Sequence, residues 1–594
     1  MGAEEILCRL RREGNISREK LADGFCTVQQ LALLESGRAE PAPQLLDVLL
    51  QRLGKSPDKL EVILSWDQYQ IKEVFDQFER FVYKKEIKKA QALLSGALKS
   101  LAEKGGVWKM HYYRYCAMYE QYCASDWKRA EKYLIKALNL TLPGWTARKL
   151  DRYLISTLEI ENLLALLEIQ MRIGESRSGE LEKRLSDCYD YITNILTDKE
   201  EKAKVLCKCA WLYAGFLLSQ GQQQKAFLLC EEALELLRDC GISYFMLPLI
   251  DRMLACEGTQ EQKHQKRKLE NYRSVLVYVQ KYGENWYPQA SIYHSICKRE
   301  YHLDSEIIQL ERLSKGLTQE EICEGIFQSA RSLSQIECCK SVPRKKSFEL
   351  LMERLGLKGG RYCSNILTES FEVLELENEF IRMTVKEQQE NLAKTINELK
   401  RRLVMELPEN QRAIWSYENE LERREHSRPA EELLEEAHQI LHTTYNLREK
   451  GCYRVPFRRE AFLIIQIAVL LGELGCLDKA EQLYRNLLQV YQDSKLPERY
   501  HFSTCSTIYN NLAKLLDSEE LAKEGLRLDL YCGNLNTMYY KVFQIGLGKK
   551  KRCEAEEGRR LVQDAYWLCK LAKNPNRNWI ENFYKDTYNK DILE

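Results

Sequence analysis

One pattern of residues occurs twice in this chain. The stretch 16–21 near the start matches 317–322 in the middle, and Gly24 matches Gly325. The offset is 301 residues before the turn and 302 after it, so the second copy has gained one residue there. A repeated pattern of this kind predicts two copies of one folding unit. The match continues at Leu31, Leu34, Glu35, Pro41 and Arg52, which correspond to Leu333, Ile336, Glu337, Pro343 and Arg354.

The sequence of each copy predicts two short helices joined by a tight turn. Thr318 is a good N-cap with Glu321 three residues later, Gly325 supplies the turn, and a second helix follows at once. Leu333 and Ile336 give that helix an apolar face, which we expect to point inward. This pattern predicts a helix-turn-helix motif. The opposite face of the second helix gathers side chains that can hydrogen-bond base edges or phosphates, namely Gln328, Arg331, Ser332 and Gln335.

Both copies resemble the lambda-repressor-like (XRE-type) helix-turn-helix domain, which consists of five short helices. The resemblance implies DNA contacts on the second motif helix, at the start of the first motif helix, and in the basic stretch that follows. In the second copy these positions are Gln319, Gln328, Arg331, Ser332, Gln335, Lys340 and Arg344. In the first copy they are Arg18, Gln29, Gln30 and Arg38.

The two copies differ where the resemblance places the DNA contacts. In the first copy Ala32 and Leu33 are apolar at positions where the family usually has polar or basic side chains. In the second copy Cys339 stands where the first keeps Gly37. The sequence leaves open whether both copies read DNA or whether one is retained only for packing.

Between and after these copies the sequence predicts helices with a repeating spacing of small and large residues. Ala130, Leu134 and Ala137 show the spacing, which resembles the tetratricopeptide repeat, where small residues allow two antiparallel helices to cross closely. An ordinary amphipathic bundle can show one such triplet, but several in register favour a helical solenoid. The others are Ala90, Leu94 and Ala97; Ala226, Cys230 and Ala233; Ala430, Leu434 and Ala437; and the clearest single repeat, Ala468, Gly475, Ala480, Tyr484 and Leu487.

Composition agrees with a helical protein of several domains. The 594 residues predict about four units. With 12 prolines and 29 glycines the chain has few helix breakers. We expect an all-α fold with two copies of a five-helix lambda-repressor-like domain, each followed by a tetratricopeptide-like solenoid. The expected domains are 1–66, 67–303, 304–367 and 368–594. Asn285 and Trp286 resemble Asn578 and Trp579, which supports a tandem duplication.

Several functional classes find no support in the sequence. The net charge of +1 excludes a global polycation, so DNA binding must be local. The 21 cysteines lack the paired spacing of a zinc site, and we expect reduced thiols without a metal or cofactor. No phosphate-binding loop or hydrolase motif is evident, so an enzyme is not expected. The start of the chain lacks a signal-peptide pattern and no apolar run is long enough for a membrane span, which predicts a cytoplasmic protein.

The complete arrangement resembles the peptide-pheromone-responsive regulators of Gram-positive bacteria, the PlcR and Rgg class. That class dimerises through its repeat domain and binds a short signalling peptide there, with asparagines on inner helices holding the peptide backbone. The nearest counterparts in this chain are Asn510 and Asn511. An asparagine can donate to and accept from an extended peptide, but it can equally form an ordinary hydrogen bond between repeats.

The sequence therefore predicts a transcription regulator that binds double-stranded DNA and responds to a peptide or protein ligand on its solenoids. Members of the class are usually single units, so a fused duplication would form a monomeric pseudo-dimer with diverged halves. A homodimer with four helix-turn-helix domains is the alternative assembly. The rival function is a protein-interaction scaffold whose helix-turn-helix domains no longer read DNA, and the sparse basic charge favours it.

Overall fold

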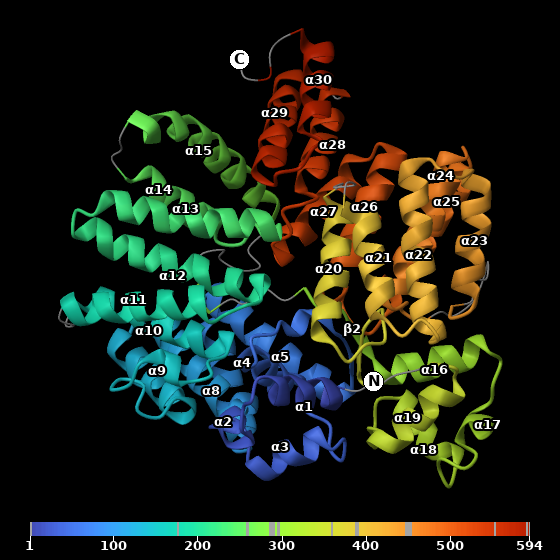
Figure 1. The fold of residues 1–594 in the computed structure, drawn as a ribbon, viewed down its shortest axis with the longest axis horizontal. Coiled ribbons are helices and arrows are strands. Elements are labelled where there is room, and N and C mark those ends of the chain that lie inside the picture. Colours follow the sequence, from blue (N-terminus) through green and yellow to red (C-terminus); the bar gives the residue numbers. More distant parts are fainter. Residues whose placement is uncertain are drawn as a thin grey trace.

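The computed structural model describes residues 3–174, 178–256, 260–283, 291–293, 298–357, 360–386, 391–445, 454–551, 554–589 and 592. Two four-helix units lie along one edge of the molecule, and a long helical array extends from each (Figure 1). Asn285 and Trp286 lie outside the described residues. Within the described part, no helix is long and apolar enough to cross a membrane.

The first four-helix unit begins the chain and ends in a short strand. Its elements are α1 (Ala3–Glu13), α2 (Arg18–Ala22), α3 (Val28–Glu35), α4 (Pro43–Arg52), the 3-10 helix η1 (Pro57–Lys59) and β1 (Glu61–Leu64).

The first array follows directly and is built from helices joined by short connections. It consists of α5 (Trp66–Tyr83), α6 (Ile87–Leu93), η2 (Leu94–Leu98), α7 (Lys99–Ala102), α8 (Gly106–Tyr119), η3 (Glu120–Ala124), α9 (Trp127–Thr141), η4 (Leu150–Arg152), α10 (Thr157–Ile173), α11 (Ser178–Asn194), α12 (Lys199–Ser219), α13 (Gln223–Cys240), α14 (Met246–Leu254), α15 (Gln260–Val279) and η5 (Gln280–Gly283).

The second four-helix unit is flanked by two short strands. Its elements are β2 (Tyr301–Leu303), α16 (Asp304–Ser314), α17 (Gln319–Cys323), α18 (Ala330–Glu337), α19 (Lys345–Arg354) and β3 (Tyr362–Cys363). The four helices of each unit have the same lengths, 11, 5, 8 and 10 residues in order. Their starting residues are offset by 301 before the turn and 302 after it, as the sequence alignment predicts.

The second array completes the chain. It consists of α20 (Phe371–Val385), α21 (Leu392–Arg402), α22 (Pro408–Glu425), α23 (Ala430–His442), α24 (Arg458–Glu473), α25 (Leu477–Asp493), η7 (Glu498–Tyr500), α26 (Phe502–Leu516), α27 (Glu519–Cys532), α28 (Met538–Lys551), α29 (Ala555–Leu571) and α30 (Arg577–Tyr588).

Consecutive helices pack against each other in both arrays, and small residues lie where they cross. Ala130, Ala226, Ala233 and Ala468 are all at most 1% exposed. Alternate helices also touch: α10 contacts α12, and α12 contacts α14. This is the stacking expected of a helical solenoid, in which each hairpin buries the face of its neighbour.

For the triplet that begins at Ala90, the prediction that the third residue, Ala97, packs between helices is wrong. Residues 94–98 form a π-helical turn, η2, in which one extra residue is accommodated per turn. The register shifts by one residue as a result, so that Leu98 is buried and Ala97 is exposed.

The fold is all-α as expected, with one small sheet that was not predicted and with four helices in place of the expected five in each unit. Three short strands form one sheet in the order β2-β1-β3. In the first unit the fifth helix is replaced by the single 3-10 turn η1 and the apolar strand β1, and in the described part of the second unit Arg354 is followed by β3. The apolar run Val62-Ile63-Leu64 forms a strand because both of its faces are buried.

The sheet is the seam between the two units. Strand β1 runs parallel to β2, which leads into α16, and antiparallel to β3, which follows α19. Val62 and Leu64 belong to the apolar core that includes the first unit, whereas Ile63 belongs to the core of the second. One strand therefore contributes its two faces to two different cores.

Candidate nucleic-acid interface

The helix that would enter the major groove in the second unit is α18. Arg331 and Gln335 are exposed along it, and Ser332 is half-buried between them. Gln328 is exposed two residues before the helix begins, and not on the helix as predicted. Leu333 and Ile336 are buried on the opposite side, as predicted. Exposed groups without a partner are available to a ligand. In the described part of the chain, none of the side chains of Gln328, Arg331, Gln335, Lys340 and Arg344 forms a hydrogen bond or ion pair.

The corresponding helix of the first unit, α3, presents a less polar surface. Gln29 is exposed and free of a partner among the described residues, but the amide oxygen of Gln30 accepts a 2.9 Å hydrogen bond from the Thr27 backbone N–H. This bond completes the capping box of α3. Leu33 is 38% exposed, so an apolar side chain lies on the face that would meet DNA. Arg38 is exposed beyond the helix.

Two predicted DNA contacts, Arg18 and Gln319, take part in internal networks. Arg18 Nε lies 2.8 Å from Glu35 Oε2, and Gln319 Nε2 donates to Glu337 Oε2 at 2.7 Å. Both carboxylates are buried. Burial opposes the ionisation of Glu35, but hydrogen bonds from Arg11 and Arg18 outweigh it and lower the pKa of this group. Arg18 and Gln319 therefore orient the motif helices from within.

Each unit has the same internal network, centred on an arginine of its first helix. Arg11 donates to Glu35 and to the Ile16 carbonyl, and its counterpart Arg312 donates to Glu337 and to the Leu317 carbonyl. Sequence reasoning missed these residues. The signal was available, because the two arginines have the same offset of 301 as the motif helices.

The last residue of the fourth helix makes a second shared contact. Arg52 donates to the Leu21 and Asp23 carbonyls, and Arg354 donates to the Ile322 and Glu324 carbonyls. In both units this arginine ties the fourth helix to the turn between the motif helices.

The surroundings of Arg52 and Arg354 differ. Arg52 is 4% exposed and pairs with Glu159 of α10 at 2.7 Å, so the first unit is fastened to the first array. Arg354 is exposed. Glu460, which occupies the third position of α24 as Glu159 does in α10, pairs with Arg454 instead.

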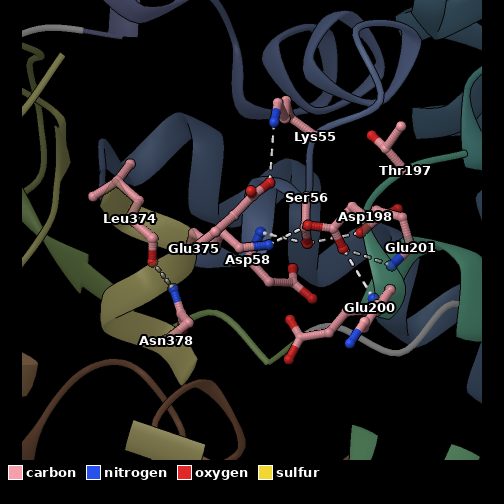
Figure 2. Close-up of polar contacts among 12 residues, drawn as sticks. Lys55, Ser56, Asp58, Thr197, Asp198, Glu200, Glu201, Leu374, Glu375 and Asn378 are labelled. Carbon is pink, nitrogen blue, oxygen red and sulfur yellow. Dashed lines mark hydrogen bonds and ion pairs between the residues drawn. The ribbon is translucent and has the colours of Figure 1, made fainter. Parts of the chain in front are cut away.

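A charged junction fixes the end of the first unit between the two arrays (Figure 2). Lys55 reaches Glu375 of α20 at 3.1 Å, and Ser56 donates to Glu201 of α12 at 2.8 Å. Lys204 of α12 contacts Asp58 at 2.9 Å. Burial opposes ionisation of Asp58, but Lys204 and Arg299 outweigh it and lower the pKa of this carboxyl. The first unit is therefore held by ion pairs to both arrays.

The two units also touch each other directly. Lys345 at the start of α19 donates to Glu4 Oε1 at 2.5 Å and to the Gly37 carbonyl at 3.0 Å. Tyr362 of β3 donates to the Pro41 carbonyl at 2.7 Å. Lys345 is therefore engaged in contacts between the two units. Its neighbour Arg344 has no hydrogen bond or ion pair with the described residues and can bind a ligand.

The two asparagines singled out as peptide ligands lie half-buried on α26. Asn511 Nδ2 donates to Tyr484 Oη at 3.0 Å, which is the hydrogen bond between helices that the sequence left open as an alternative. The Oδ1 atom of Asn510 is buried without a partner.

Comparison with known proteins identifies the first unit. The helix-turn-helix family model HTH_3 matches residues 9–60. These residues are a helix-turn-helix domain. The match confirms the predicted motif in the first copy, and the second copy at 304–367 stays a prediction. No curated protein matches the chain.

The solved structures that resemble this chain do so with low sequence identity and low TM-scores. Bacillus thuringiensis PlcR in complex with the peptide PapR7 and DNA is 16% identical, covers 48% of this chain and 99% of its own, and has a TM-score of 0.32. The Streptococcus dysgalactiae pheromone receptor Rgg2 is 12% identical, covers 48% and 99%, and has a TM-score of 0.25. The hetero-tetramer Cut9-Hcn1 is 13% identical, covers 84% and 86%, and has a TM-score of 0.25. Identities and scores this low leave the function to be inferred from the chain's own residues.

Proposed function

We propose that this protein is a DNA-binding transcription regulator in which two helix-turn-helix units read two half-sites. The observation that carries the proposal is the repetition of the HTH_3 unit. Helices α16–α19 repeat the lengths and offsets of α1–α4, and Arg312 and Arg354 repeat the contacts of Arg11 and Arg52. A second unit built on the same internal contacts presents its own recognition helix.

The side chains on α18, together with Gln328 just before it, suit direct reading of bases. Arg331 can bind guanine through two hydrogen bonds, and Gln335 and Gln328 can do the same with adenine. Lys340 and Arg344 follow the helix and can contact phosphates. On α3, Gln29 offers one polar contact, and Leu33 suits the methyl group of thymine. The two half-sites should therefore differ in sequence.

The two halves are further proposed to form a pseudo-dimer within one chain. In a twofold dimer, equivalent residues meet each other at the axis. In the β1–β3 pairing Glu61 lies opposite Cys363, and these residues are equivalent by the offset of 302 that applies after the turn. The pairing between the two units is therefore centred on equivalent residues.

A second pairing of equivalents joins the two arrays. Cys240-Gly241 at the end of α13 corresponds to Cys532-Gly533 at the end of α27. Just beyond, the Ser243 N–H donates to the Gly533 carbonyl at 2.8 Å, and the Leu535 N–H donates to the Gly241 carbonyl at 2.9 Å. These two bonds exchange under a twofold rotation. Together with the contact of α15 with α29, they support an axis through the molecule.

The arrays would carry the signal that modulates DNA binding. A peptide or a partner protein is the proposed ligand, with the unpaired Oδ1 of Asn510 as one acceptor for an amide in the second array. Because the first unit is ion-paired to both arrays, a change in their relative position would move the two recognition helices.

One observation favours a second function, that of a protein-interaction scaffold. Glu320, Glu321 and Glu324 are exposed on and after α17, next to the recognition helix. Acidic side chains at this place would repel phosphates, and exposed Val28 and Leu33 on α3 could instead pack against an apolar protein surface.

Selection of fragments from sheared genomic DNA by the purified protein, at two salt concentrations, tests the proposal. We expect a compact site with two unequal half-sites about 10 base pairs apart, centre to centre. Affinity should fall steeply with salt, because phosphate contacts release counterions. If no fragment is enriched at either salt concentration, with or without cell extract as a source of ligand, the scaffold function takes precedence.

A further inference from the structure

A cavity of about 90 Å³ lies beside the sheet, where the first unit meets the second array. Its inner wall is formed by buried residues of the first unit, namely Ile6 of α1 and Glu61 and Ile63 of β1. Half-buried residues that follow β3, and others at the start of α24, line its outer part. The cavity has room for roughly six to nine groups of the size of a water molecule.

Arg459, the second residue of α24, brings a positive charge to the lining of this cavity. Its Nη1 atom donates to the Asn365 carbonyl at 3.0 Å and to the Glu409 carbonyl at 3.1 Å, so the main chain fixes the guanidinium in place. Among the described residues Arg459 forms no ion pair, and its remaining N–H groups are left for a ligand. A guanidinium that is held at one edge can present another edge to a carboxylate and bind it through two hydrogen bonds.

A second arginine adds to the positive potential at this place. Arg412 of α22 lies one turn after Glu409 and pairs with its carboxylate at 3.5 Å. The Nε atom of Arg412 is buried and has no partner among the described residues. Burial, and next the charge of Arg459, lower the pKa of Arg412, although two carboxylates act in the opposite direction. The two guanidinium groups therefore repel each other, and a bound carboxylate would relieve this repulsion.

The same part of the cavity offers hydrogen-bond acceptors. The Oδ1 atom of Asn365 is buried and has no partner in the described part of the chain, and buried Glu409 contributes a carboxylate. Because both residues also hold Arg459 through their main-chain carbonyls, these acceptors lie next to the guanidinium. An amide oxygen and a carboxylate together suit an ammonium group, which has three N–H donors.

Two further carboxylates line the cavity, and both are engaged in closer contacts. Glu61 lies 2.9 Å from His302, and Glu460 lies 2.7 Å from Arg454. A ligand with one carboxylate, one ammonium group and a short aliphatic body therefore matches the lining. The apolar part of the wall consists of Ile6, Leu60, Ile63, Leu367 and Phe457.

The equivalent positions of the first array are apolar. Helices α8 and α10 flank α9 as α22 and α24 flank α23. The second residues of α8 and α10 are Val107 and Leu158, and those of α22 and α24 are Glu409 and Arg459. Val107 and Leu158 pack with Phe25 of the first unit in one apolar cluster. Since a buried charged pair is seldom more stabilising than apolar packing, its presence beside a cavity favours a role in binding.

We propose that this cavity binds a small amino acid with an aliphatic side chain, of the class of valine, leucine and isoleucine. The carboxylate of the ligand lies against Arg459, its ammonium group against Asn365 Oδ1 and Glu409, and its side chain against the apolar wall. These amino acids have about eight or nine non-hydrogen atoms, which fits the size of the cavity. The inference concerns a small ligand at the junction and holds whether or not the protein binds DNA.

The test measures thermal unfolding and heats of binding of the full-length protein with L-valine, L-leucine and L-isoleucine. We expect at least one of them to raise the Tm by about 2–5 °C at saturation, because a ligand that binds only the folded state stabilises it. Analogues of that amino acid without the amino group, or without the carboxyl group, should bind at least about tenfold more weakly. The proposal is overturned if none of the three amino acids binds, or if either analogue binds equally well.

Two variants and a control locate the ligand. Thr368→Trp fills the half-buried part of the lining, leaves the charged residues in place and should abolish the response. Arg459→Leu with Glu409→Val introduces the residues of the first array and should abolish it too, whereas Arg401→Leu, at an exposed arginine of α21, should keep it. If the double variant does not fold, Thr368→Trp alone decides. A full response in the Thr368→Trp variant would place the amino acid elsewhere and overturn the proposal.

Discussion

The two four-helix units share their helices and their internal contacts but differ in how they are attached. The turn of the first unit lies against the first array: a Cβ at Gly24 would lie 2.2 Å from the Leu140 carbonyl oxygen. Gly325 in the second unit has the same positive φ, and a Cβ there would meet nothing within 4 Å. The same motif is thus embedded on one side of the molecule and open on the other.

The difference extends to the core of each unit. Phe25 in the first turn is 3% exposed and packs with Val107 and Met110 of α8, so the first unit shares a core with its array. The second unit has a small core of its own, to which Ile63 and Cys363 of the sheet and Phe457 contribute from outside. The two units therefore keep the same internal hydrogen bonds, although the first is packed against its array and the second keeps an exposed polar surface. The predictions that follow test this contrast.

The largest contrast is expected at the matched arginines. Arg52→Met should destabilise the first unit by about 3–5 kcal/mol, because it leaves Glu159 buried without its partner. Arg354→Met should cost the second unit about 1 kcal/mol, because only exposed hydrogen bonds to carbonyls are lost. Native-state hydrogen exchange of the helices in each unit measures both values. Equal losses would mean that the first unit is not held by its array.

A smaller contrast is expected at the matched glycines. Gly24→Ala should cost about 3 kcal/mol, because the left-handed backbone strain adds to a clash with the Leu140 carbonyl that only a backbone shift can relieve. Gly325→Ala should cost about 1–2 kcal/mol, since it meets only the backbone strain. Thermal unfolding and limited proteolysis near each turn report the outcome. A Gly325 variant as damaged as the Gly24 variant would show that the second turn is also packed.

For DNA binding we expect the larger loss from substitutions in the second unit, the reverse of the order expected for stability. Arg331→Ala should weaken binding by about 1–3 kcal/mol and relax the choice of base at one position of its half-site. Gln29→Ala is expected to cost less than about 1 kcal/mol, because α3 has few polar side chains to lose. Lys340→Ala should weaken binding evenly across sequences and reduce the salt slope by about 1. Fluorescence anisotropy with a selected site measures all three, and a larger loss for Gln29→Ala would assign the main reading to the first unit.

The seam between the units should respond to acid. Burial favours the neutral form of Glu61, but its hydrogen bond with His302 and the charge of Arg458 outweigh burial and lower its pKa. A carboxyl with a lowered folded pKa stabilises the protein above its ordinary value of 4.5 and ceases to do so as the pH falls through the folded pKa. Glu61→Gln should therefore lower the Tm at neutral pH, where the ionised carboxylate stabilises the protein, and reduce the further loss of Tm below pH 4.5. An unchanged acid profile would show that Glu61 does not couple the units to pH.

Much of the architecture was readable from the sequence because it depends on local chemistry. The predicted cap Thr318 and its counterpart Ser17 both accept backbone hydrogen bonds at their helix starts, and the alanine spacing marks where array helices cross. The helices α16–α19 keep the offsets of 301 and 302 from α1–α4, since a shared pattern of caps and apolar residues forms the same helices.

The features that were missed depend on contacts between distant residues. Strand β1 is four residues long, and only its partners β2 and β3, from far along the chain, make it a strand. Arg18 and Gln319 were predicted only as DNA contacts, and their hydrogen bonds to Glu35 and Glu337 were not predicted, because these partners lie 17 and 18 residues further along the chain. The cavity beside the sheet has no local signal, because Ile63, Asn365 and Arg459 in its lining are far apart in sequence.

The smallest effect is expected where the second unit lost a glycine. Cys339 adopts φ +60, the same left-handed conformation as Gly37 at φ +68, which costs a residue with a side chain about 1–2 kcal/mol. Cys339→Gly removes that strain and gives up two weak sulfur contacts, with Ser305 Oγ at 3.1 Å and Lys495 Nζ at 3.4 Å. We expect the second unit to gain about 1 kcal/mol in hydrogen exchange, whereas Gly37→Cys should destabilise the first. If Cys339→Gly is neutral or destabilising, the sulfur contacts stabilise the second unit by at least as much as the backbone strain destabilises it. The second unit would then be held more firmly than the open surroundings of Gly325 indicate.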